Sequence, residues 1–143
     1  MSKILKIKAR QVFDSRGNPT IEAEVYSKNL SASAICPSGA STGTYEAFEK
    51  RDTNNKKYLG KSVLGAVNLV NTKISKKLTG TNIHDQIRID TILINLDGTR
   101  QKTSLGANAI LAVSMAAKKL SAKIKNVPLY KTFLLKNNYK LPY

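Results

Sequence analysis

Apolar and polar residues alternate through the first third of the chain, as they do in strands that bury one face. Residues 4–13 and 20–26 both follow this period of two, and a third short stretch runs from 31 to 36. The segment 14–19 is dense in turn-forming residues, and 28–29 supplies a second turn. The pattern therefore predicts a three-stranded antiparallel meander, with one apolar face made by Leu5, Ile7, Ala9, Ile21, Ala23 and Val25.

After the meander the apolar period changes from two to about 3.6. An apolar stripe from Val63 to Leu78 predicts a helix that Ser62 can cap and that ends before Gly80. A short helical turn is also expected over residues 46–51. Further helices are predicted from Asp85 to Leu96, from Ala107 to Leu120, and in a short segment opened by Pro128. The sum is an α+β fold, a small antiparallel sheet followed by a helical bundle.

Composition and charge narrow the class of protein. The chain has 143 residues, enough for one domain with a real core, and its single cysteine, Cys36, excludes an internal disulfide. Because no stretch is long and apolar enough for a membrane span, and none has the form of a signal peptide, we expect a cytoplasmic protein. The net charge of +15 comes mainly from lysines spread along the chain. They favour weak, salt-sensitive binding to polyanions rather than a specific nucleic-acid site.

One loop stands out as a candidate ligand site. The run Pro37-Ser38-Gly39-Ala40-Ser41-Thr42-Gly43 places two glycines four residues apart among three hydroxyls. A nucleotide-binding phosphate loop is excluded, because such a loop ends in Gly-Lys-Ser/Thr and Gly43 is followed by Thr44. A glycine-hinged loop with free hydroxyls and carbonyls suits Mg²⁺ or an oxyanion, and an ordinary surface connection has the same pattern.

Other polar residues admit a chemical and a structural interpretation. Glu22 and Glu24 point the same way from one strand. They are either a carboxylate pair for metal binding or acid–base chemistry, or acidic residues on the solvent-exposed (wet) face of a sheet. Arg16 can hold an anion or fasten its own turn. Cys36 is a reactive thiol or a small buried hydrophobe, and the lone His84 marks the entry to a helix. No nucleophile, histidine and acid combine into a catalytic set.

Several separate motifs resemble the N-terminal domain of the enolase (phosphopyruvate hydratase) family, in the same order, from Ile4 to about Tyr130. They are Asp14-Ser15-Arg16-Gly17-Asn18-Pro19-Thr20, the loop Pro37 to Gly43, Leu96-Asp97-Gly98-Thr99, Gly106-Ala107-Asn108-Ala109-Ile110-Leu111 and Val127-Pro128-Leu129-Tyr130. The resemblance implies a capping domain, here residues 1–143, in front of a (β/α) barrel.

The resemblance also implies a reaction and roles for named residues. Enolases reversibly dehydrate 2-phospho-D-glycerate to phosphoenolpyruvate in glycolysis with Mg²⁺, and enolase-superfamily sites pair a Lys or His base with that metal. The segment from Ser38 through Gly39, Ala40, Ser41 and Thr42 to Gly43 would be the substrate lid, and Ser41 would ligate the metal. Arg10 and Glu22 match positions that form ion pairs in the family's homodimers.

The chain departs from the family pattern mainly at Leu141-Pro142-Tyr143, where the barrel is expected to begin. The family's base, acid and carboxylate metal ligands belong to that barrel, so no catalytic residue is expected in these 143 residues and the chain alone is expected to be inactive. The alternative function is a stand-alone basic module that binds nucleic acid or another polyanion.

Overall fold

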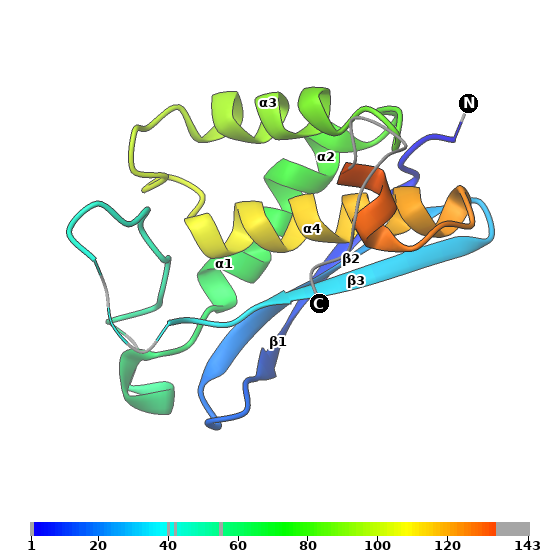
Figure 1. Cartoon of the computed structure of the whole chain (residues 1–143). Helices are drawn as coiled ribbons and strands as arrows, with labels where there is room; N and C mark the ends of the chain where they lie inside the picture. The colour runs from blue at the N-terminus through cyan, green and yellow to red at the C-terminus, as the bar shows by residue number, and fades with distance from the viewer. Residues whose placement is uncertain (1, 40, 42, 55, 134–143) are drawn as a thin grey trace.

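The computed structural model describes residues 2–39, 41, 43–54 and 56–133. Three strands, β1 (Lys6–Phe13), β2 (Pro19–Ser27) and β3 (Leu30–Cys36), form an antiparallel sheet in the order β1-β2-β3. Ala23 of β2 pairs with Ala9 on one side and Ala34 on the other. The predicted meander is confirmed, and Figure 1 shows it as the lower layer of the molecule.

The helical part follows the sheet in sequence and covers one of its faces (Figure 1). A short 3-10 turn, η1 (Lys57–Gly60), leads to a continuous helical run, made of α1 (Leu64–Leu69), a π turn η2 (Val70–Ile74) and α2 (Ser75–Leu78). The remaining helices are α3 (Gln86–Asp97), α4 (Ala107–Ile124) and the 3-10 segment η3 (Leu129–Phe133). The α+β prediction is therefore confirmed.

The core lies between the sheet and the helices. Ile21, Ala23 and Val25 of β2 are fully buried, which confirms the β2 part of the predicted apolar face. The long helix α4 packs on β2 and β3 and buries five of its alanines, whose small side chains allow close approach to the sheet. In Figure 1, α3 lies on the far side of α4 from the sheet, so that the helices form two layers.

The two edge strands are each covered by side chains from helices. The Asn71 amide, in the π turn, accepts a hydrogen bond from the Ala9 N–H at 2.8 Å and donates to the Ala9 carbonyl at 3.0 Å. On the other edge, the ammonium groups of Lys119 and Lys123 donate to carbonyls of β3. Such covers keep an open sheet from pairing with further strands.

Two sequence predictions about element ends are wrong. Leu5 is 55% exposed, whereas Ile4 is fully buried. The reason is that β1 begins at Lys6, and Ile4 instead exchanges backbone hydrogen bonds with Gly80 and Thr81. Ser62 does not cap a helix but donates its hydroxyl hydrogen to Gln11 Oε1 at 2.9 Å.

The cap of α1 comes from a more distant residue. The Asp52 carboxylate accepts from the Gly65 N–H at 3.1 Å. At α3 the predicted cap is confirmed, because Asp85 accepts from the Arg88 N–H at 3.0 Å. Gly80, with a φ of 89°, lies just after α2 as expected.

The helical turn predicted over residues 46–51 is also wrong. The Phe48 N–H donates to the Gln101 carbonyl and the Phe48 carbonyl accepts from the Ala107 N–H, both at 2.7 Å. Next to it, the Asn108 side chain accepts from the Lys50 N–H at 3.1 Å and donates to the Lys50 carbonyl at 3.0 Å. Since these tertiary partners take backbone groups that a helix would use, the segment is not helical.

The connection between α3 and α4 is organised around the buried Asp97. Its carboxylate accepts from the Leu105 N–H at 2.7 Å and from both the N–H and the hydroxyl of Thr99. Burial raises the pKa of this carboxyl, but the hydrogen bonds from Thr99 and Leu105 favour the charged form more strongly, so its pKa lies below the ordinary value.

Candidate functional site

The glycine loop follows β3 directly, since that strand ends at Cys36. Ala40 and Thr42 of the predicted lid lie outside the described residues, and Ser41 is exposed. At the far end of the loop, the Gly43 N–H donates to Glu46 Oε1 at 3.0 Å and the Gly43 carbonyl accepts from the Glu46 N–H at 3.2 Å. The loop therefore offers the Ser41 side chain to solvent, and its far end is bonded to a residue three positions further along the chain.

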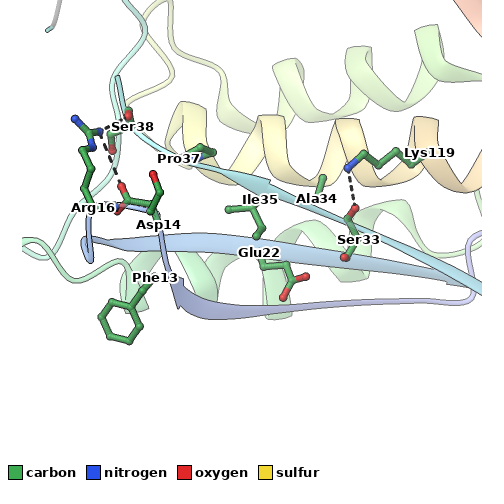
Figure 2. A pocket seen from close by; sticks show the side chains of 11 residues that line it. Phe13, Asp14, Arg16, Glu22, Ser33, Ala34, Ile35, Pro37, Ser38 and Lys119 are labelled. Atoms are coloured by element: carbon green, nitrogen blue, oxygen red, sulfur yellow. Dashed lines mark hydrogen bonds and ion pairs between the residues drawn. The ribbon is translucent and has the colours of Figure 1, made fainter. Parts of the chain in front are cut away.

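Arg16 reaches from the β1–β2 hairpin to the start of this loop. Its guanidinium donates to the Ser38 carbonyl at 2.7 Å and to the Gly39 carbonyl at 3.4 Å (Figure 2). The hairpin itself is held by Asp14, whose carboxylate accepts from the backbone N–H groups of Arg16 and Asn18, each at 2.9 Å. The pKa of Asp14 is lowered, mainly by the hydrogen bond from Asn18. Arg16 thus holds the start of the loop in addition to its own turn.

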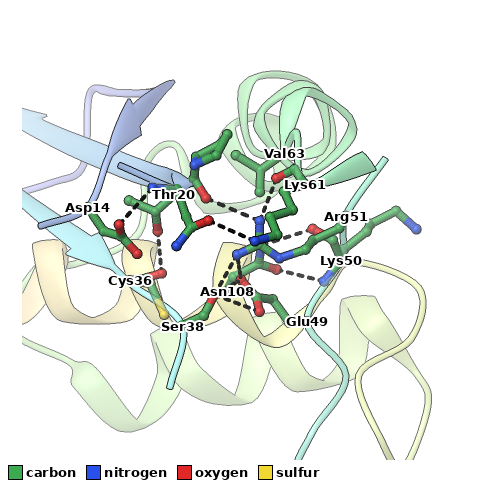
Figure 3. Close-up of polar contacts among 12 residues, drawn as sticks. Asp14, Thr20, Cys36, Ser38, Glu49, Lys50, Arg51, Lys61, Val63 and Asn108 are labelled. Carbon is green, nitrogen blue, oxygen red and sulfur yellow. Dashed lines mark hydrogen bonds and ion pairs between the residues drawn. The ribbon is translucent and has the colours of Figure 1, made fainter. Parts of the chain in front are cut away.

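A second cluster holds the Ser38 side chain. The Ser38 hydroxyl donates to the Glu49 carboxylate, 2.6 Å from Oε1, and accepts from Arg51 Nη2 (Figure 3). Arg51 Nη2 also lies 2.8 Å from Glu49 Oε1. Arg51 is only 18% exposed, and its other nitrogen donates to the carbonyls of Pro19 and Lys61. The three side chains join the loop to the start of β2 and to the segment before α1.

An open groove of about 750 Å³ runs beside the loop base. Figure 2 shows it between the hairpin and β3, with residues of both signs of charge on its walls. Basic groups come from Arg16 and Lys119 and acidic groups from Asp14 and Glu22, while Phe13 and Ile35 supply apolar surface. The groove is therefore mixed in character and lies where another domain or a ligand could contact the loop.

The two acids of β2 share one arginine. Arg10 Nε lies 2.7 Å from Glu22 Oε2, and Arg10 Nη1 lies 3.5 Å from Glu24 Oε2. The pKa of Glu24 is lowered, first by a hydrogen bond from the Tyr26 hydroxyl and next by that from Ser31. Both acids are thus neutralised by charge and hydrogen bonds on the outer face of the sheet, and the wet-face interpretation fits this arrangement better than a catalytic pair.

Cys36 and His84 take structural positions. Burial, with a smaller effect of the Glu49 charge, raises the pKa of the Cys36 thiol, which disfavours the reactive thiolate. His84 Nδ1 lies 2.8 Å from the Ser121 hydroxyl, and burial together with Lys125 lowers the pKa of the imidazole. Within the described part of the chain, no three His, Cys, Asp or Glu side chains gather in a way that could hold a metal ion.

Comparison with known proteins decides the family. The family model described as "Enolase, N-terminal domain" matches residues 4–133. The chain belongs to the enolase N-terminal domain family. It is 95% identical over its whole length to an Enolase of Pelagibacter ubique, of which it covers 34%. Enolases of Methanosarcina mazei and Methanococcus vannielii are 51% and 56% identical over 140 residues. The chain spans about a third of the length of these curated relatives.

The enolase motifs found in the sequence now have structural explanations. The motif around Asn108 clamps the backbone of Lys50. Gly106 has a φ of 93°, and a Cβ there would lie 2.5 Å from Lys50 Cβ. The motif that begins at Asp14 presents Arg16 to the loop. These motifs hold the chain around the glycine loop, which the sequence order alone does not reveal.

Glu49 and Arg51 were not singled out from the sequence. They fall in the segment 46–51, for which a helical turn was predicted, and residues two apart on a helix point in different directions. In the structure both side chains contact the Ser38 hydroxyl. The only local signal was a charged pair just after a glycine-rich loop.

Among the helices of the described residues, none is long and apolar enough to cross a membrane.

Proposed function

We propose that this domain is the lid-bearing part of a cytoplasmic enolase that reversibly dehydrates 2-phospho-D-glycerate to phosphoenolpyruvate in glycolysis. The observation that carries the proposal is the family match over residues 4–133, which includes the complete loop motif. The relatives named Enolase are about three times as long as this chain. The resemblance puts the base and the carboxylate metal ligands in the barrel that makes up the rest of such a protein.

Ser41 is the proposed metal ligand of this domain. Its hydroxyl and backbone carbonyl are the hard oxygen donors that Mg²⁺ prefers, and the residue is exposed on the loop. Because the described residues bring together no acidic or histidine cluster, this domain suits an ion held mainly by other groups. Magnesium bound there would supply Lewis-acid stabilisation of negative charge that develops in the reaction.

Closure of the loop would bring Ser41 to the metal ion. Gly39 and Gly43 bracket the segment that would close; the Gly39 carbonyl accepts from Arg16, and the Gly43 N–H donates to Glu46. Closing such a lid excludes water and fixes the substrate between the domain and the barrel. In this proposal the domain contributes one ligand, the lid and orientation, while proton transfer is carried out by barrel residues.

Arg10 and Glu22 are the proposed contacts of a homodimer. In the chain they pair with each other at 2.7 Å, and the Arg10 side chain is 58% exposed. In a homodimer, Arg10 of one subunit would form its ion pair with an acidic side chain of the other subunit, either in place of the pair within its own chain or in addition to it. An exposed ion pair contributes little by itself, so the exchange has a low cost.

The test uses a chimera in which residues 1–143 replace the matching third of the Pelagibacter ubique enolase. The unjoined domain is expected to form no phosphoenolpyruvate with Mg²⁺ present, because it lacks a base within reach of the substrate proton. The chimera is expected to be active. Turnover by the purified domain, or an inactive but folded chimera, would contradict the proposal.

Ser41→Ala in the active chimera tests the metal role. Removing one neutral ligand should lower kcat about 10-fold and raise the magnesium concentration needed for half activity, because only part of the ion's effect is lost. The exposed Ser104→Ala is the control. An unchanged rate and magnesium dependence in Ser41→Ala would exclude Ser41 as a ligand.

A second candidate function, binding of nucleic acid or other polyanions, is favoured only by the net charge of +15. Binding through dispersed lysines should be blind to sequence and should weaken steeply between low and physiological salt. Titration of single-stranded and duplex oligonucleotides at both salt concentrations measures this. Tight binding to one sequence at physiological salt would favour this second function over the first.

A further inference from the structure

The Ser38 hydroxyl is the only loop hydroxyl in the described residues for which the structure shows both a donor and an acceptor partner. It donates to both oxygens of Glu49, at 2.6 and 2.8 Å, and accepts from Arg51 Nη2. The Arg51 nitrogen is simultaneously 2.8 Å from Glu49 Oε1, so a serine, a carboxylate and a guanidinium close a three-membered ring of contacts (Figure 3). Hydrogen bonds with charged partners are stronger than those between neutral groups.

This ring is attached to parts of the domain that do not belong to the loop. Arg51 Nη1 donates to the carbonyl of Pro19, at the start of β2, and to that of Lys61, just before α1. The segment that carries Glu49 and Arg51 is itself clamped, since Asn108 of α4 bonds both backbone groups of Lys50. Ser38 is therefore fixed to the sheet and, through two chain segments, to the helices.

The other end of the loop is held differently. Among the contacts of the described residues, those of Gly43 are with Glu46, three residues further along the same exposed segment. A contact between near neighbours in sequence moves with the loop, whereas the contacts of Ser38 cross to distant segments. The loop is therefore held more firmly at Ser38, whose carbonyl also accepts from Arg16, than at Gly43.

We propose that Glu49 and Arg51 are positioning residues that anchor Ser38 at the base of the lid, so that the lid delivers Ser41 in one register. The inference rests on the proposed function, because delivery of Ser41 matters only if the lid closes. In this proposal the Ser38 hydroxyl belongs to the anchor and does not ligate the metal ion. Glu49 and Arg51 act through Ser38 and do not touch substrate.

Loss of the anchor has a definite kinetic signature. Freeing one more residue in the open loop adds backbone freedom that closure must remove, which lowers the closure equilibrium roughly 10-fold. If closure and binding of the metal by Ser41 are coupled, the magnesium concentration for half activity should rise by about the same factor. At saturating magnesium kcat should stay within about twofold, because Ser41 is still present.

The variants are Ser38→Ala, Glu49→Gln and Arg51→Gln, with Arg88→Gln on the exposed side of α3 as the control for loss of an arginine. Ser38→Thr keeps a hydroxyl and should restore most of the magnesium affinity. Arg51→Gln also removes the bonds to Pro19 and Lys61 and can lower overall stability. Ser38→Ala leaves those bonds in place and therefore keeps the test valid if Arg51→Gln does not fold.

Two measurements are made. Hydrogen exchange of the 143-residue domain should show about 10-fold faster exchange in the peptide covering residues 37–43 of Ser38→Ala, with unchanged exchange in β2 and α4. In the chimera, the same variant should show the rise in half-saturating magnesium with kcat nearly unchanged. If the unsubstituted chimera is inactive the proposed function fails, and the exchange experiment still tests the anchor.

The result that would overturn the inference is equal loop exchange and equal magnesium dependence in Ser38→Ala and the unsubstituted protein. A uniform increase in exchange over the whole domain would also overturn it, because the cluster would then support the fold and not the loop. Failure of Ser38→Thr to restore magnesium affinity would exclude the hydroxyl as the essential group.

Discussion

Replacing Asn108 by alanine tests how the domain holds the segment behind the loop. Asn108 is 3% exposed, and its amide makes two hydrogen bonds, 3.1 Å from the Lys50 N–H and 3.0 Å from the Lys50 carbonyl. The alanine variant removes both and leaves two partly buried backbone groups without their partners. We expect a loss of about 2–3 kcal/mol in the free energy of unfolding, at about 1–1.5 kcal/mol for each hydrogen bond.

This loss converts into a shift of the melting temperature. Unfolding entropies of about 2 cal/mol/K per residue give roughly 0.3 kcal/mol per kelvin for a domain of this size, so Tm should fall by about 7–10 °C. Circular dichroism during heating and urea titration measure both quantities. Asn108→Asp is the matched variant, because it keeps the acceptor for the Lys50 N–H and loses only the donor to the Lys50 carbonyl.

The result that would refute this reasoning is an Asn108→Ala variant whose Tm changes by less than about 2 °C, which would mean that water replaces the clamp without cost. An Asn108→Asp variant as stable as the original would show that the bond to the carbonyl contributes nothing. Faster hydrogen exchange confined to residues 46–51 would support the view that the Asn108 side chain holds this segment in place.

Three further outcomes are expected. Because the folded pKa of Asp97 lies below its unfolded value, its stabilisation is complete above the unfolded pKa, near pH 4, and is lost as pH falls through the folded pKa. Acid titration of Asp97→Asn should therefore show less loss of stability below pH 4 than the original chain. Gly106→Ala should cost about 2–4 kcal/mol, because the new Cβ would lie 2.5 Å from Lys50 Cβ at a φ of 93°. Gly80→Ala has a similar φ of 89° but no atom within 4 Å, so urea titration should show a loss of only about 1 kcal/mol.

The period of apolar residues was sufficient to predict the main elements. A strand buried on one face requires alternation, and a helix packed on a sheet requires a stripe, so the meander and the helices were visible in the sequence. Capping at Asp85 and the position of Gly80 after α2 were also predicted, because caps depend on residues only a few positions apart.

Predictions failed where a distant segment competes for the same backbone groups. Residues 46–51 are not helical because Gln101, Ala107 and Asn108 take hydrogen bonds of Phe48 and Lys50. Ser62 turns to Gln11, which is 51 positions away, and Asp52 supplies the helix cap instead. Local propensity carries no information about such partners.

The same distinction between local features and contacts with distant segments applies to the candidate site. The glycine-hinged loop and Ser41 were recognised from sequence, since backbone freedom and oxygen donors are properties of the residues themselves. The cluster of Ser38, Glu49 and Arg51 was not, because it forms only where the chain after β3 meets the segment that carries Glu49 and Arg51. The sequence by itself determined which atoms the loop offers. The tertiary structure decided which of them are already bonded, since hydrogen bonding depends on distances between segments that the order of residues does not specify.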